Sequence, residues 1–267
     1  MAVNPKAESG AAKTMAKDGD TGLPPGLETA WGLRERPGKG PRPGLSVSRI
    51  VDTAVGLANA EGLPAVSMGR IASALGVSTM SLYRYVSSKE ELLVLMQDAA
   101  YGLPPEGPAP EEGWRAALAH WARAMREVLY GNLWMLRVPI TAPPTTPRAL
   151  AWMERGLVCL RGTGLDEGEK IETILLVSGF VRSEATMTAD LVSAARASGR
   201  TVEETMAAYT RLLARLADPE RFPAVNEVLR AGVMTEEGAP DEEFAFGLAR
   251  LLDGIEVLVA ARSARGR

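Results

Sequence analysis

Residues 67–89 read SMGRIASALGVSTMSLYRYVSSK and contain two short helical patterns separated by a turn. Ala72 lies where two helices would cross closely, and Gly76, four residues later, suits a turn that requires a positive φ. Leu82 follows six residues after Gly76, on the expected inner face of the second helix. This layout is typical of a helix-turn-helix, whose second helix enters the major groove of DNA.

The second of these helices is the candidate reading element. Its candidate contact residues combine hydroxyls, a cation and an aromatic ring, and they are Thr79, Met80, Ser81, Arg84 and Tyr85. Arg84 can grip a guanine with two hydrogen bonds or hold a phosphate, and both interpretations stay open. Met80 can pack on a thymine methyl group but cannot donate a hydrogen bond. Leu82 and Val86 are expected in the core.

The charge distribution supports a local phosphate-binding surface. The formal net charge is −3. Residues 34–89 nevertheless carry eight Lys/Arg against three Asp/Glu, whereas residues 90–267 carry nineteen against twenty-six. A basic segment attached to an acidic body is the pattern that a nucleic-acid-binding protein shows.

The first 44 residues are rich in Gly, Pro and Lys and show no helical or strand period, so we expect 1–44 to be a largely disordered basic extension. Four cations near its end form a possible DNA arm: Arg34, Arg36, Lys39 and Arg42. The alternative is a solubilising tail.

The rest of the chain predicts an all-α protein with an N-terminal three-helix helix-turn-helix domain at 45–102 and a larger helical domain at 103–267. Ser46, Ser67, Ser78 and Ser88 are expected N-caps, and Glu91 would complete a capping box with Ser88. The sequence LPPEGP interrupts the helical pattern from residue 103. The later helices are expected at about 111–130, 146–161, 166–195, 201–217 and 241–261, with a short turn or helix at 132–137.

Composition excludes several function classes. Cys159 is the only cysteine and His120 the only histidine, so neither a disulfide nor a multi-histidine metal site can form within one chain. No nucleophile–base pair, paired-carboxylate or phosphate-loop motif indicates an enzyme. The N-terminus lacks the apolar core of a signal peptide, and no apolar run is long enough to span a membrane. The single cysteine fits a reducing compartment. We therefore expect a cytoplasmic protein, and we expect no cofactor or metal.

These residues resemble the TetR (tetracycline-repressor-like) family of transcriptional regulators. The resemblance rests on AEGLPAVSM at 60–68 and IASALGVSTMSLYRYVSSKEELL at 71–93, and it is strongest over Leu45–Ala99. The stretch FAFGLARLLDGIEVLVA at 244–260 is similar to the regulatory domain of actinobacterial members.

The resemblance implies a homodimer that binds a palindromic double-stranded DNA operator and is released, as a repressor, by a small hydrophobic molecule. It assigns DNA contacts to Ser67, Thr79, Met80, Ser81, Tyr83, Arg84, Tyr85 and Lys89. Ser67 would offer a backbone amide to a phosphate, and Lys89 a side-chain ammonium. Gly69 departs from the family pattern, because many members carry a side chain there that reaches DNA.

The resemblance also places an effector pocket and a dimer interface in the later helices. Candidate pocket residues are the aromatic and methionine side chains Trp114, Trp121, Met125, Trp134, Met135, Trp152, Met153, Phe180 and Met187; ordinary core packing is the alternative for each. The helices at 166–190 and 241–261 would form a four-helix bundle with their symmetry mates.

Two other functions stay open from the sequence alone. The chain could bind DNA without an effector, including as an activator. It could also be a helical protein-interaction module whose basic segment is a solvated face. Salt-dependent binding to duplex DNA distinguishes the regulator from the interaction module.

Overall fold

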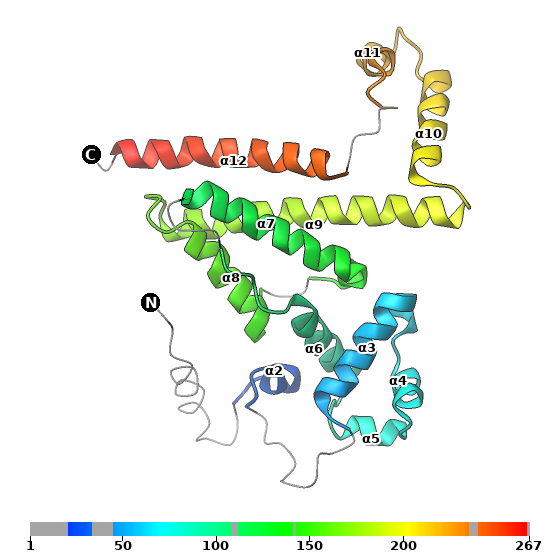
Figure 1. Ribbon diagram of the computed structural model, residues 1–267, viewed down its shortest axis with the longest axis vertical. Helices are drawn as coiled ribbons and strands as arrows, with labels where there is room; N and C mark the ends of the chain where they lie inside the picture. The colour runs from blue at the N-terminus through cyan, green and yellow to red at the C-terminus, as the bar shows by residue number, and fades with distance from the viewer. Residues whose placement is uncertain (1–20, 34–44, 108–111, 141–142, 235–239, 266–267) are drawn as a thin grey trace. The chain divides into compact units, whose positions relative to one another are not determined.

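The computed structural model describes residues 21–33, 45–107, 112–140, 143–234 and 240–265. Within these ranges the secondary structure is helical, without β-strands, which confirms the all-α prediction (Figure 1). The chain divides into two compact units, Met1–Arg161 and Gly162–Arg267. No helix in the described part of the chain has the length and apolar character needed to cross a bilayer.

The first unit is a set of short and medium helices. They are α2 (Pro25–Ala30), α3 (Val47–Glu61), the 3-10 turn η1 (Leu63–Ala65), α4 (Met68–Leu75), α5 (Thr79–Tyr83), α6 (Lys89–Tyr101), α7 (Gly113–Gly131), the 3-10 segment η3 (Leu133–Arg137) and α8 (Pro147–Cys159).

Serine caps set the starts of the four helices from α3 to α6. The hydroxyls of Ser46, Ser67, Ser78 and Ser88 each accept the backbone amide three residues further on, at 3.1 to 3.3 Å. Each such cap typically contributes about 1 kcal/mol, because it satisfies an amide that the helix leaves without a partner. All four positions match the sequence prediction.

A small core orients α4 and α5 against α3 and α6. Five of its side chains have no exposed surface: Ile50, Ile71, Leu82, Val86 and Leu92. Gly76 ends α4 with a φ of 69°, and the Val77 amide bonds back to the Ala72 carbonyl at 3.0 Å. This left-handed ending turns the chain sharply, so α5 projects from the unit as the helix-turn-helix pattern predicts.

A short helix forms within residues 1–44, the stretch that the sequence predicts to be largely disordered. Residues Pro25–Ala30 form α2, which packs against α6. Pro25 occupies the first turn, where a missing amide costs nothing. The Gly/Pro composition that suggested disorder here supplies a helix start and, at the buried Gly26, a close approach to α6. Arg34, Arg36, Lys39 and Arg42 lie outside the described residues.

The helices α7 and α8 belong to the same compact unit as the helix-turn-helix. The Trp121 indole donates to the Trp152 carbonyl at 3.0 Å, and the Trp152 indole donates to the Tyr101 carbonyl at 3.2 Å. These bonds link α7, α8 and the end of α6. The chain is non-helical at 102–107, where the sequence predicts a domain boundary at residue 103.

The described residues of the second unit form two long helices and two shorter ones. They are α9 (Glu167–Ala197), α10 (Val202–Leu216), α11 (Pro223–Ala231) and α12 (Pro240–Arg265). Three of them match predicted helices, and α11 was not predicted. Capping boxes at Asp166–Glu169 and Thr201–Glu204 fix the starts of α9 and α10.

Contacts between α9 and α12 hold the second unit together. The rings of Phe180 and Phe244 stack with centroids 5.5 Å apart. Near the other end of α12, the Arg262 guanidinium donates to the Glu169 carboxylate, with Nε at 2.8 Å from Oε1. The buried side chains of these two helices include Ile174, Val177, Val181 and Ala185 on α9, and Phe244, Leu248, Leu252 and Ile255 on α12.

Candidate nucleic-acid interface and effector-binding residues

Helix α5 buries one of its five side chains, that of Leu82. Met80 is 75% exposed and Tyr83 is 45% exposed. Thr79 and Ser81 are half-buried, and the Ser81 hydroxyl lies 2.9 Å from the Ser78 hydroxyl. An exposed methionine between two hydroxyl-bearing residues can meet both thymine methyl groups and groove-edge acceptors.

The reading helix is shorter than the sequence suggested. It ends at Tyr83, so Arg84 is its C-cap and Tyr85 lies in the following turn. The reason is local: the amides of Tyr85 and Val86 both bond to the Leu82 carbonyl, which closes a tight turn. Arg84 is exposed and Tyr85 half-buried, so both remain available for contacts from this turn rather than from the helix.

Two further candidates sit at the starts of neighbouring helices. Ser67 is the exposed N-cap of α4, and Lys89 is the exposed first residue of α6. Backbone amides at a helix start carry partial positive charge, which attracts a phosphate oxygen. Gly69, in the first turn of α4, is exposed and has open space at the position of a Cβ. It therefore offers backbone but no side chain to a ligand.

The cation next to Gly69 is engaged within the protein. The Arg70 guanidinium donates to both carboxylate oxygens of Glu61, at 2.9 and 2.6 Å. The hydrogen bond from Arg70 lowers the pKa of Glu61, and the same bond raises the pKa of Arg70. Both side chains are exposed, so the pair ties the end of α3 to α4 with a modest energy.

The predicted capping box at the start of α6 is half formed, and this finding brings in residues that the sequence analysis missed. Ser88 caps the Glu91 amide as expected. The Glu91 carboxylate, however, accepts the amide and hydroxyl of Ser87 through Oε2 and the Thr29 hydroxyl through Oε1. The bond to Ser87 could have been predicted, because two serines precede Lys89 within reach of the Glu91 side chain. The bond to Thr29 could not, because Thr29 and Glu91 are 62 residues apart in the sequence.

Seven of the nine candidate pocket residues belong to the first unit, and two of them form a ring contact. Trp121 and Trp152 lie 6.5 Å apart between ring centroids and are 3% exposed. Trp134 and Met135 in η3 are equally buried, and the Trp134 indole nitrogen is enclosed without a described hydrogen-bond partner. The half-buried members of this unit are Trp114, Met125 and Met153.

The remaining two candidates are in the second unit and differ from each other. Phe180 stacks on the buried Phe244, which is the arrangement of a core residue. Met187 is 71% exposed on α9. Neither position by itself points to a ligand.

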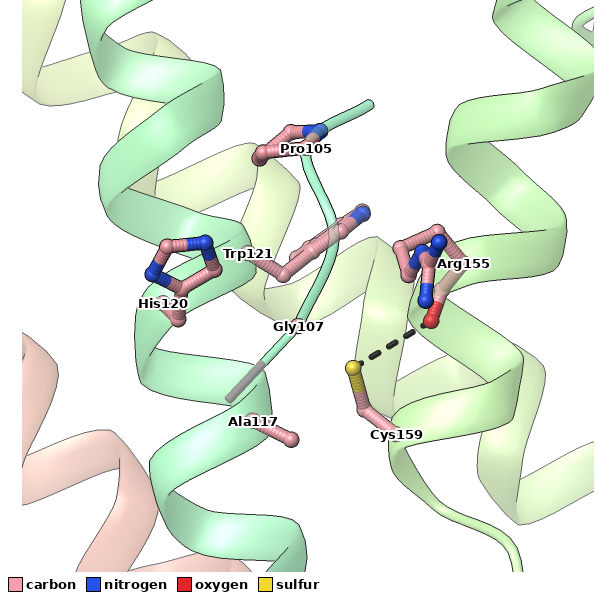
Figure 2. A pocket seen from close by; sticks show the side chains of 7 residues that line it. All are labelled: Pro105, Gly107, Ala117, His120, Trp121, Arg155 and Cys159. Atoms are coloured by element: carbon pink, nitrogen blue, oxygen red, sulfur yellow. Dashed lines mark hydrogen bonds between the residues drawn. The ribbon is translucent and has the colours of Figure 1, made fainter. Parts of the chain in front are cut away.

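A small recess lies between α7, α8 and the segment before α7 (Figure 2). Trp121 is the candidate pocket residue that lines it, and the other lining residues are Pro105, Gly107, Ala117, His120, Arg155 and Cys159. The space corresponds to about one water molecule, so the recess is too small for an effector in this conformation.

Cys159 behaves as a core residue, as the sequence predicts. Its thiol is buried and donates to the Arg155 carbonyl at 3.2 Å (Figure 2). Burial raises the pKa of the Cys159 thiol, which keeps it protonated and weakly nucleophilic. His120 is exposed at the edge of the recess. Among the described residues no cluster of three or more His, Cys, Asp or Glu could bind a metal ion.

Comparisons with known proteins agree with this geometry. Residues 50–96 match the family described as "Bacterial regulatory proteins, tetR family", and residues 107–259 match "Tetracyclin repressor-like, C-terminal domain". The second match alone covers more than half of the chain.

Individual relatives point the same way. The HTH-type transcriptional repressor DrrR1 of Streptomyces coeruleorubidus is 39% identical over 239 residues, which cover 88% of this chain and 86% of the relative. The HTH-type transcriptional repressor Rv1353c of Mycobacterium tuberculosis is 28% identical over 236 residues, 85% of each chain.

Solved structures of ActR from Streptomyces coelicolor have a similar fold. The apo structure superposes with a TM-score of 0.67 at 26% identity and covers 84% of this chain and all of ActR. The complex of ActR with actinorhodin superposes with a TM-score of 0.66 at 27% identity, covering 80% of this chain and 96% of ActR.

Proposed function

This chain belongs to the TetR family of bacterial transcriptional regulators, and on that premise we propose that it is a repressor that binds a palindromic operator as a homodimer and is released by a small hydrophobic molecule. As a regulator of this family it is not an enzyme. Operator binding would place it in the cytoplasm, where the chromosome lies.

The observation that carries the proposal is the exposed reading element. Met80, Tyr83 and Arg84 project from a helix and turn whose Leu82 and Val86 are fully buried. Such anchoring fixes the direction of the contact side chains before DNA arrives, which reduces the entropy lost on binding. We propose that Thr79, Met80 and Ser81 face bases, and that Ser67, Tyr83, Tyr85 and Lys89 hold phosphates or base edges. Arg84 grips a guanine or a phosphate.

We place the DNA-binding domain at 45–102 and the effector-binding and dimerisation domain at 103–267. The outer faces of α9 and α12 support a homodimer, because they expose large apolar side chains that a soluble chain normally covers. These are Ile171, Leu175, Leu176 and Met187 on α9, and Phe246, Val257 and Leu258 on α12. Two such faces from each subunit would form a four-helix bundle.

For the effector we propose a flat hydrophobic molecule, bound among the aromatic residues of the first unit. The buried pair Trp121 and Trp152 with the nearby half-buried Met125 and Met153 supports this class of ligand. ActR, a similar protein, was crystallised with actinorhodin. Because the recess at Trp121 holds about one water molecule, effector binding would require α7 and α8 to separate.

Selection of bound duplexes from a random DNA pool tests the central proposal. A dimer with two reading helices enriches an inverted repeat whose half-sites are spaced by about one helical turn or a multiple of it. Failure to enrich any sequence, or enrichment of a single half-site without symmetry, contradicts the proposal.

Sedimentation of charge variants tests the dimer. Leu176→Glu and Val257→Glu would each place a carboxylate in the proposed interface and produce monomers at micromolar concentration. Leu103→Glu is a matched control, because Leu103 is 77% exposed but lies outside α9 and α12. A wild-type monomer, or dimers that tolerate both interface charges, would contradict the proposed interface.

A further inference from the structure

The carboxylate of Glu91 joins three segments of the first unit. Glu91 lies in the first turn of α6 and is 6% exposed. A buried carboxylate is costly unless hydrogen bonds replace its lost water, so its partners are held firmly in place. Those partners come from the turn before α6 and from α2.

On the turn side, Oε2 of Glu91 accepts the Ser87 amide at 2.7 Å and the Ser87 hydroxyl at 2.5 Å. Ser87 lies between two proposed DNA-contact residues, Tyr85 and Lys89. The Glu91 carboxylate is therefore bonded to the turn that carries both of them.

On the other side, Oε1 of Glu91 accepts the Thr29 hydroxyl of α2 at 3.1 Å. The two helices are in contact at this point, since a Cβ built on Gly26 would lie 3.4 Å from Glu91 Cα and 3.6 Å from Val94 Cβ, which is ordinary packing distance. The packing of α2 on α6 therefore places Thr29 within hydrogen-bond distance of the same carboxylate that accepts the Ser87 bonds.

The end of α2 is attached to a third element. The Trp31 indole donates to the Thr145 carbonyl at 2.8 Å, and Thr145 immediately precedes Thr146, the N-cap of α8. Figure 1 shows α2 beside α6 and the start of α8. The short helix therefore spans from the DNA-contact turn to a helix that carries candidate effector residues, all within one compact unit.

We infer that α2 is a positioning strap: through Thr29 and Glu91 it fixes the turn that presents Tyr85 and Lys89, and through Trp31 it ties that turn to the start of α8. Operator affinity then depends on a helix outside the helix-turn-helix. This inference rests on the proposed DNA-binding function.

The test compares variants of the full chain on the duplex recovered by random-pool selection. Thr29→Val keeps the shape but removes the hydroxyl, and it should weaken operator binding about tenfold, or about 1.4 kcal/mol. Thr29→Ser keeps the hydroxyl and should stay within about twofold of wild type. Thr205→Val is the matched control, because the Thr205 hydroxyl bonds to the Thr201 carbonyl within its own helix.

Hydrogen exchange supplies a readout that a general loss of stability would not reproduce. In Thr29→Val, the Ser87 amide should exchange about tenfold faster while the amides of α7 keep their wild-type rates. Trp31→Phe, which removes the donor to Thr145 but keeps a ring, should weaken operator binding about threefold.

The outcomes separate the inference from its premise. Wild-type affinity and unchanged Ser87 exchange in Thr29→Val would overturn the strap, as would equal losses in Thr29→Val and Thr29→Ser. Wild-type affinity in Trp31→Phe would overturn the tie to α8. If the wild-type chain itself enriches no operator, it is the proposed function that fails.

Discussion

Replacing Gly247 with alanine should destabilise the second unit, because the new methyl group would collide with Phe180. A Cβ at residue 247 would lie 2.6 Å from Cζ and 2.7 Å from Cε2 of that ring. Carbon atoms pack best at about 3.5–4.0 Å, so the ring must retreat by about 1 Å. It cannot do so freely, since it stacks on Phe244, which is 3% exposed.

The size of the effect follows from two opposing contributions. Overpacking of this kind costs about 1–3 kcal/mol, and the better helix propensity of alanine returns up to about 1 kcal/mol. Gly56→Ala is the matched control, because Gly56 is exposed in α3 and a Cβ there would meet nothing within 4 Å. The propensity gain is shared, so Gly247→Ala should be about 1–3 kcal/mol less stable than Gly56→Ala.

Urea denaturation followed by circular dichroism, at one protein concentration for every variant, measures this difference. Phe180→Leu in the Gly247→Ala background should recover part of the loss, because the smaller side chain removes the collision. Equal stabilities of Gly247→Ala and Gly56→Ala would refute the reasoning. The Phe180 ring would then be free to move, and Phe180 would remain a candidate pocket residue.

Two further predictions concern the proposed DNA contacts, and a third concerns the ion pair between α3 and α4. Arg84→Ala should weaken operator binding by more than about 1 kcal/mol if Arg84 grips a base, and wild-type affinity in a gel-shift titration would exclude this. Lys89→Ala should weaken specific and non-specific binding alike and flatten the salt slope by about one; an unchanged slope would remove Lys89 from the phosphate contacts. The hydrogen bond from Arg70 lowers the pKa of Glu61 in the folded state. The stabilisation from this pair is therefore fully present at pH values above the pKa of Glu61 in the unfolded chain, and it is lost as the pH falls through the lower pKa of Glu61 in the folded state. In Glu61→Gln the acid side of the stability–pH curve should therefore be flatter, and a curve that matches wild type would contradict the assignment.

Several features of the fold could be predicted from short stretches of sequence. The serines at 46, 67, 78 and 88 and the threonine at 201 mark helix starts, because a cap needs only the amide three residues further on. Gly76 marks the turn for a similarly local reason, since its positive φ is a property of one residue. The burial of Leu82 and Val86 follows from helical spacing.

Other features depended on partners far along the chain. The sequence pattern placed Glu91 in a capping box, but the packing of α2 on α6 turned its carboxylate toward Ser87 and Thr29. Phe180 was a plausible pocket residue until α12 brought Phe244 and Gly247 against its ring.

The sequence by itself therefore determined the helical class and the helix-turn-helix, and it supplied the side chains that we propose as DNA contacts, because these depend on bonds and spacings within a few residues. Only the tertiary structure decided that α2 packs against α6, that the Glu91 carboxylate binds Thr29, and that Phe180 stacks on Phe244. These outcomes depend on how helices distant in sequence pack together, which no local pattern records.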